Sequence, residues 1–146
     1  MRFEVSLVVG VSREKAYSAY ADFEATPKWS KDKHEVKISR REGNTVFLEG
    51  SSRAGGSQGA REVKLFPPER VESHGETRLT RASSVVRFDE VPGGTRITAS
   101  LDVEVKGRWS WIFKTQAKSE AESSAMEELE SFARYIEGPP SATRPA

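Results

Sequence analysis

The side chains that could do chemistry are few, and Glu128 is the most informative of them. At about 100° per residue it falls within the apolar stripe of a helical pattern over residues 116–137, away from the charged face. A carboxylate in apolar surroundings is costly unless it is paired or hydrated. Glu128 therefore either reaches water at the edge of the stripe or serves as a polar anchor inside a pocket. In the second case we expect Arg61 as its partner, although Arg61 could equally lie at the exposed end of a strand.

Familiar catalytic and metal-binding patterns do not occur in the sequence. His34 and His74 lack ligand spacing, cysteine is missing, and there is no Gly-x-Ser-x-Gly elbow. The segment Gly55-Gly56-Ser57-Gln58-Gly59 lacks the Lys-Ser or Lys-Thr of a phosphate loop, so we interpret it as a flexible hairpin connection. We expect no metal and no cofactor. We also expect no recognisable catalytic constellation, with Glu128 as a weak catalytic candidate, so enzymatic activity stays an open question.

The composition is that of an ordinary globular domain. Of the 146 residues 36% are hydrophobic and 31% charged, and 23 basic residues balance 22 acidic ones. This balance removes the electrostatic argument for nucleic acid as a partner. The longest apolar run, Val8 to Val11, is far shorter than the roughly 20 residues of a membrane span. No cleavable signal pattern opens the chain, so we expect a cytoplasmic protein without stable membrane insertion.

Several elements must position these residues, beginning with a strand and two short helices. Residues 3–11 alternate apolar and polar side chains, which predicts a half-buried strand. Ser12 is placed to cap a following helix, whose first turn contains Glu14. Residues 22–29 indicate a second short helix or turn, interrupted at Pro27.

The rest of the chain predicts a sheet followed by one long helix. About six strands follow one another from residue 34 to residue 106, and the alternation is clearest from Ile97 onward. Residues 116–137 form the longest helical pattern, which ends at Gly138. We expect a single ligand-binding domain over residues 1–138 and a flexible tail over residues 139–146.

This order of elements resembles the helix-grip fold of the START-like (SRPBCC) superfamily, which includes polyketide cyclases, coenzyme-Q-binding proteins and the major birch-pollen allergen. The likeness covers residues 3–137 and is carried by four segments: Val5 to Tyr17, Asp22 to Trp29, Pro67-Pro68-Glu69-Arg70-Val71, and Phe88 to Thr98. It implies an α+β domain in which a curved antiparallel sheet of about six to seven strands wraps around the long C-terminal helix. It also implies a cavity beneath that helix.

The long helix itself suggests where such a cavity would lie. The inward stripe of its second half carries large side chains, whereas that of its first half carries alanines and a serine. Because protein interiors are close-packed, the thin half must be compensated, approach the sheet closely or leave a hollow. On the hypothesis that a hollow is left, we expect ligand-binding residues on the helix, on the sheet and on two aromatic segments. They are Trp29, Arg61, Val63, Trp111, Ala117, Ala121, Ser124, Ala125 and Glu128.

Three functions are compatible with this sequence. The first is binding or transport of a small hydrophobic molecule such as a lipid, isoprenoid, quinone or polyketide-like compound. The second is a cyclase, aromatase or dehydratase that uses the same cavity, with Glu128 as general acid or base. The third is a module that binds a protein partner through its surface. The sequence leaves the ligand and the oligomeric state open.

Overall fold

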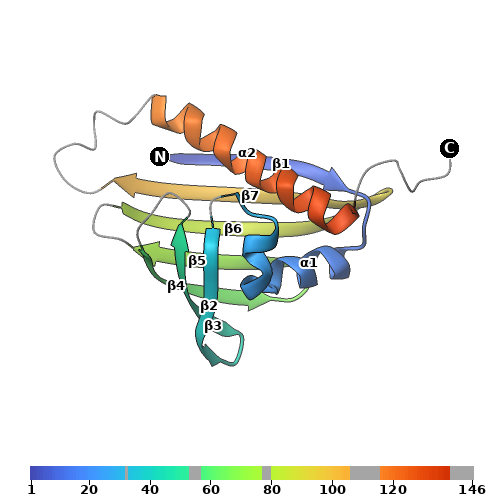
Figure 1. The fold of residues 1–146 in the computed structure, drawn as a ribbon. Coiled ribbons are helices and arrows are strands. Elements are labelled where there is room, and N and C mark those ends of the chain that lie inside the picture. Colours follow the sequence, from blue (N-terminus) through green and yellow to red (C-terminus); the bar gives the residue numbers. More distant parts are fainter. Residues whose placement is uncertain (32, 53–56, 77–79, 106–115, 139–146) are drawn as a thin grey trace.

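The computed structural model describes residues 1–31, 33–52, 57–76, 80–105 and 116–138. In these ranges seven strands and two α-helices, with one short 3-10 helix, follow one another (Figure 1). The elements are β1 (Arg2–Val9), α1 (Arg13–Ala21), η1 (Phe23–Lys28), β2 (Lys33–Glu42), β3 (Thr45–Ser52), β4 (Ser57–Phe66), β5 (Arg70–Glu76), β6 (Thr80–Val91), β7 (Gly94–Val105) and α2 (Gln116–Glu137). The predicted helix-grip architecture is confirmed.

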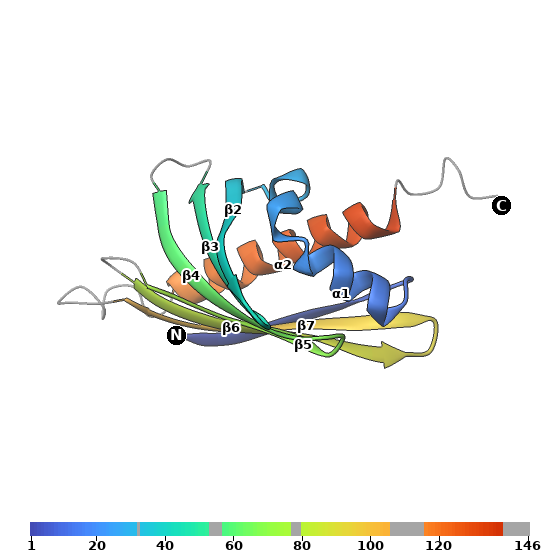
Figure 2. The same ribbon diagram turned by 90° about the horizontal axis from the view of Figure 1, so that it is seen from below.

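All seven strands belong to one antiparallel sheet in the order β1-β7-β6-β5-β4-β3-β2. The first strand therefore pairs with the last, from Arg2 opposite Asp102 to Val9 opposite Thr95. Figure 2 shows β2, β3 and β4 turned away from the other strands. The sheet is thus bent into two walls that meet at an angle. Both helices lie inside this angle, with α2 running along the wall that contains β1 and β7 (Figures 1 and 2).

The short helices start where the sequence predicts. The hydroxyl of Ser12 accepts a hydrogen bond from the backbone N–H of Lys15 at 3.2 Å and so caps α1. Near this point the hydroxyl of Thr95 donates to the carbonyl of Val11 at 2.8 Å. A Cβ at Gly94 would lie 1.9 Å from the carbonyl oxygen of Val9. A glycine is therefore required where β7 meets the end of β1.

The filled part of the core lies under the second half of α2. Leu129, Phe132 and Ile136 are buried there, together with residues of β1, α1, η1 and the sheet. Tyr20 is at the centre of an aromatic cluster, with ring centroids 5.5 Å from Phe132 and 5.9 Å from the ring of Phe88. This cluster holds α1 and η1 against α2 and forms one boundary of the candidate ligand-binding site described below.

Two of the sequence predictions lie outside the described residues. These are the aromatic connector with Trp111 and the flexible tail over residues 139–146. Within the described part of the chain, no helix combines the length and the apolar character that crossing a bilayer requires.

Candidate ligand-binding site

The part of α2 around Ala125 faces small side chains of the sheet. On the inner face of the sheet Ser73 of β5 pairs with Ser84 of β6, two residues along from the pair of Val71 and Val86. Since residues two apart in a strand share a face, both serines lie on the same side as these buried valines. Ala99 of β7 lies beside them and contributes to the same wall. Short side chains on the helix and short side chains on the sheet therefore face each other, which leaves space between them.

Two adjoining cavities occupy this space. The smaller, of about 130 Å³, lies toward β2 to β5, and the larger, of about 210 Å³, lies between α2 and strands β6 and β7, with Arg61 of β4 at its edge. Four residues line both cavities: Tyr20, Trp29, Arg61 and Glu128. The remaining wall is mainly apolar, with Phe23, Val36, Leu48, Val63 and Val71 in the smaller cavity and Val86, Ala99, Leu101, Ala125, Leu129 and Phe132 in the larger.

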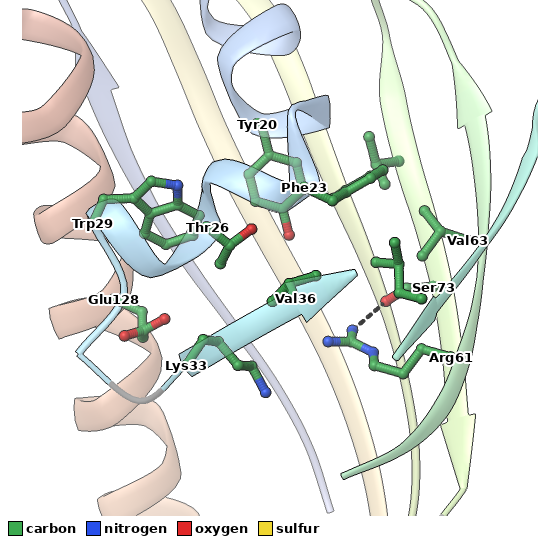
Figure 3. Close-up of a pocket in the computed structure, with 12 residues that line it drawn as sticks. Tyr20, Phe23, Thr26, Trp29, Lys33, Val36, Arg61, Val63, Ser73 and Glu128 are labelled. Atoms are coloured by element: carbon green, nitrogen blue, oxygen red, sulfur yellow. Dashed lines mark hydrogen bonds between the residues drawn. The ribbon is translucent and has the colours of Figure 1, made fainter. Parts of the chain in front are cut away.

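Arg61 reaches the cavity by crossing the neighbouring strand. It pairs with Gly75 of β5, where a Cβ would lie 2.9 Å from the Cγ of Arg61. The missing side chain at residue 75 lets the arginine stem lie flat over β5. Its Nη2 donates to the hydroxyl of Ser73 at 2.8 Å (Figure 3). The hydroxyls of Ser73 and Ser84 are 2.6 Å apart. The two serines thus hold the guanidinium against the floor of the cavity.

Glu128 ties α2 to the segment between η1 and β2. Its Oε2 accepts from the hydroxyl of Ser30 at 2.7 Å, and its Oε1 accepts from the backbone N–H of Lys31 at 3.0 Å. The Ser30 hydroxyl in turn accepts from the N–H of Lys33 at 3.1 Å. The expectation that Arg61 pairs with Glu128 is wrong: the arginine bonds to Ser73 and the carboxylate bonds to residues 30 and 31. Glu128 is nevertheless half-buried and lines both cavities, so it lies neither in open water nor in a fully dry core.

Tyr20 and Trp29 add aromatic side chains with one polar atom each to the residues that line the cavities. Burial raises the pKa of the Tyr20 phenol; the Arg61 guanidinium acts in the opposite direction, and Glu128 adds to the increase. The phenol therefore keeps its proton near neutral pH and can donate a hydrogen bond, and Figure 3 shows its oxygen directed toward the space between Val36 and Ser73. The indole nitrogen of Trp29 is buried and has no hydrogen-bond partner among the described residues.

The structure brings together five of the nine residues expected from the sequence. Trp29, Arg61, Val63, Ala125 and Glu128 line one or both cavities. Ala121 is half-buried and Ser124 is exposed, and neither is among the lining residues. Ser124 precedes Ala125 and so lies about 100° away around the helix, at the edge of the stripe. Trp111 lies outside the described residues, and so does the side chain of Ala117.

Sequence reasoning did not single out Tyr20, Ser30, Ser73 and Ser84. A signal for the strand serines was present, because Ser73 and Ser84 interrupt an otherwise apolar alternation. Two small polar residues that are paired on neighbouring strands indicate a hollow. Only the strand register reveals that Ser73 and Ser84 are paired. Ser30 gave no such signal, since its partner is 98 residues away in the chain.

The described residues contain no group of three or more histidine, aspartate or glutamate side chains that could hold a metal ion. His74 is exposed, as its place in the strand alternation predicts. The lining residues of the two cavities thus provide a guanidinium, an ammonium, a phenol, hydroxyls and a carboxylate with two donors already bound to it. This set can orient a ligand by hydrogen bonds and charge.

Comparison with known proteins agrees with this geometry. Residues 1–137 match the model of a family described as polyketide cyclase / dehydrase and lipid transport. The chain belongs to this family. No curated protein matches the sequence.

Solved structures share the fold of this chain. A protein from Thermus thermophilus superposes with a TM-score of 0.82 at 14% identity, over 93% of this chain and 97% of the other. The Zhui aromatase/cyclase from Streptomyces sp. R1128 gives a TM-score of 0.82 at 11% identity, over 94% and 93%. A START superfamily protein from Mycobacterium smegmatis gives 0.64 at 22% identity, over 94% of both chains. At these identities the likeness establishes the fold.

Proposed function

We propose that this family member binds a small, largely apolar molecule in the space between α2 and the sheet. The observation that carries the proposal is the pairing of small side chains on both sides of that space, Ala125 on the helix against Ser84 and Ala99 on the sheet. A protein that needed only a core would fill this region, because unfilled volume costs stability. The volumes of the two cavities together fall at the lower end of the roughly 300–1,000 Å³ typical of ligand pockets.

The cavity walls explain how affinity would arise. Most of the lining is apolar, so burial of the ligand would contribute about 25 cal/mol for each Å² of apolar surface removed from water. The few polar groups lie together around Arg61, Tyr20 and Glu128, where they would fix the orientation of the ligand rather than supply most of the affinity. Binding or transport of a lipid, isoprenoid, quinone or polyketide-like compound fits a cavity whose apolar lining supplies affinity and whose few polar groups supply orientation.

A second function, cyclisation or dehydration of a bound polyketide-like chain, is favoured by the family to which the protein belongs. Arg61 and Tyr20 are both hydrogen-bond donors on the cavity wall, and such donors can polarise a carbonyl oxygen. Glu128 is less suited to the acid–base role, since both of its carboxylate oxygens already accept hydrogen bonds from residues 30 and 31. Binding is common to both functions, so it is the property to test first.

Two matched tryptophan substitutions on α2 test whether the cavity binds the ligand. Ala125→Trp would place an indole in the larger cavity, whereas Ser124→Trp would place the same group on the exposed side of the helix. We expect Ala125→Trp to remove binding and Ser124→Trp to leave it unchanged. Native mass spectrometry of each purified variant, with identification of any small molecule released on denaturation, provides the measurement.

The outcomes separate the competing functions. Retained binding in a folded Ala125→Trp protein would refute the cavity as the binding site. Loss of binding in Ser124→Trp would instead indicate a site on the outer side of α2, as a protein-interaction module would have. If the released molecule is converted to a cyclised or dehydrated product by the wild type, the protein is an enzyme as well as a binder.

A further inference from the structure

We infer that the ligand carries an anionic group, a carboxylate or a chemically similar oxygen anion, and that this group pairs with Arg61. The inference rests on the proposed function and names the chemical class of molecule that the cavity would bind. Three features of the molecule carry it: the missing counter-ion of Arg61, the balance of charge around the cavity, and the fixed position of the guanidinium.

Arg61 differs from most of the described arginines at the surface of the sheet and helices. Six of those pair with a carboxylate at N–O distances of 2.7–3.8 Å: Arg2, Arg13, Arg40, Arg70, Arg81 and Arg87. Arg61 is half-buried, and in the described part of the chain no carboxylate forms an ion pair with it. Its acceptor is the neutral hydroxyl of Ser73. A guanidinium has five N–H donors, so most of its donor capacity is not used by these residues.

A cation in this position is costly by itself. Removing a charge from water carries a large penalty unless an opposite charge or several hydrogen bonds offset it. At the surface the same arginine could remain hydrated, but here it lines both cavities beside Val63 and Val71. A ligand carboxylate offsets this cost through two parallel N–H···O bonds, the geometry to which a guanidinium is matched.

The other charges around the cavity favour the same sign of ligand. The charged residues that line the two cavities are Arg61, Lys33 and Glu128, two cations and one anion. The carboxylate of Glu128 already accepts two hydrogen bonds, one from the Ser30 hydroxyl and one from the Lys31 backbone. Because most of the N–H donors of Arg61 remain available, a ligand anion gains a partner at Arg61, whereas a ligand cation would have to compete with these two donors for Glu128.

The floor of the cavity keeps the guanidinium in place before a ligand arrives. Gly75 allows the Arg61 stem to cross β5, and the hydrogen-bonded pair of Ser73 and Ser84 holds its end. Side-chain ordering is part of the cost of binding, and here it is already met in the free protein. The apolar wall around Ala99, Leu101 and Ala125 then extends from the arginine along α2, where the apolar body of the ligand would lie.

Three probes with one ring system and different charge test this inference. They are 2-naphthoate, the neutral 2-naphthamide and the cationic 2-naphthylmethylamine, each titrated into the purified full-length protein by isothermal calorimetry. We expect the acid to bind roughly tenfold more tightly than the amide, the size of effect that a charge-assisted hydrogen bond supplies, and the amine to bind most weakly. The amide reports on the apolar cavity alone, and the ratio of acid to amide reports on Arg61.

Substitutions assign this ratio to Arg61. Arg61→Gln should reduce the ratio of acid to amide affinity to about one while amide binding persists, and Arg61→Lys, which keeps the charge but not the fork of donors, should lie between. Gly75→Ala should also lower the ratio, because the added Cβ displaces the arginine stem. Arg87→Gln, an exposed arginine on β6 with its own partner Glu4, is the matched control and should leave the ratio unchanged.

The results distinguish the failure of this inference from the failure of the proposed function. Equal binding of acid and amide by the wild type, or an acid preference that survives in Arg61→Gln, would overturn the anionic class while apolar binding stands. If the variants unfold, as circular dichroism would show, the wild-type ratio still decides the question. Binding of none of the three probes would count against the cavity as a ligand site and hence against both proposals.

Discussion

The two halves of α2 face the same sheet, but side chains fill the space beside the second half, and the larger cavity begins at the end of the first. Its second half places Leu129, Phe132 and Ile136 in the core, where Phe132 is 1% exposed, and Leu129 and Phe132 form the border of the larger cavity. Its first half places Ala125 above Ser84 and Ala99, where the larger cavity lies. Backbone geometry does not make this difference, because one continuous helix and one continuous sheet form both regions. The size of the facing side chains makes it.

This contrast shows how one fold provides both stability and a binding site. The filled half contributes the buried apolar area and the aromatic contacts that keep α1, η1 and α2 together. The hollow half contributes little to stability, so its side chains are free to serve recognition. Arg61, Tyr20 and Glu128 lie at the border between the filled half and the hollow half. A polar side chain at this border packs against the core and also lines a cavity.

Phe132→Ala would extend the hollow into the filled half and should have the largest effect. Its ring lies 4.9 Å from the ring of Trp29 and 5.5 Å from that of Tyr20, so its removal takes one aromatic contact from each. We expect the free energy of unfolding to fall by about 3–5 kcal/mol, measured by urea denaturation. Leu101→Ala is the counterpart in the hollow half. Since Leu101 is half-buried and already borders empty space, its loss should cost less than the roughly 2–5 kcal/mol of a fully buried leucine. Equal losses would show that the two halves do not differ in packing.

The sequence alone predicts the filled half better than the hollow half. Periodicity fixes the first strand, the cap at Ser12 and the long helix, since each depends on residues close together in the chain. The large residues on the second half of α2 could fit only a core. The sequence gives no local signal for the order of the strands in the sheet, because pairing β1 with β7 joins residues about 100 positions apart.

The hollow half could be predicted only in outline. The small residues on α2 indicate that space is available, but whether the sheet fills it depends on which strand residues face inward. Ser73 and Ser84 settle this point through a strand register that no sequence pattern specifies. The same limitation explains the wrong pairing of Arg61 with Glu128. Both side chains were correctly placed near one cavity, but their hydrogen-bond partners lie on segments that are distant in sequence from each other.

Glu128→Gln should have an intermediate effect, because it weakens the link that closes one side of the hollow half. The amide keeps one acceptor oxygen but places an NH2 group against a donor of Ser30 or Lys31. We expect a loss of about 1 kcal/mol in the free energy of unfolding, since the bonds are charge-assisted but partly exposed. Glu130→Gln, on the exposed face of α2, should cause no change.

A double-mutant cycle with Ser30→Ala separates this link from a catalytic role. If the two residues act through their mutual hydrogen bond, the effects of the single substitutions on stability will not add. If Glu128 instead acts as a general acid or base, turnover of a converted ligand will fall in Glu128→Gln with little change in stability. Unchanged stability together with unchanged turnover would contradict both roles.

Tyr20→Phe should have the smallest effect, and it should be confined to alkaline solution. Burial raises the pKa of the Tyr20 phenol in the folded protein above its ordinary value of 10.0. Below about pH 10 the phenol is protonated in both the folded and the unfolded state, so it makes no pH-dependent contribution. As the pH rises further, the unfolded state loses its proton first, and the wild type loses up to about 1.4 kcal/mol of stability per pH unit through this group.

Thermal unfolding between pH 8 and pH 11 measures this difference. The decline above pH 10 should be shallower in Tyr20→Phe than in the wild type, while Tyr135→Phe, an exposed tyrosine on α2, should leave the wild-type slope unchanged. Arg61→Gln should steepen the decline, because the guanidinium lowers the pKa of Tyr20 and its removal lets that pKa rise further. A slope that does not respond to Arg61→Gln would mean that the guanidinium and the phenol do not face each other across the cavity, which would also weaken their joint role in orienting a ligand.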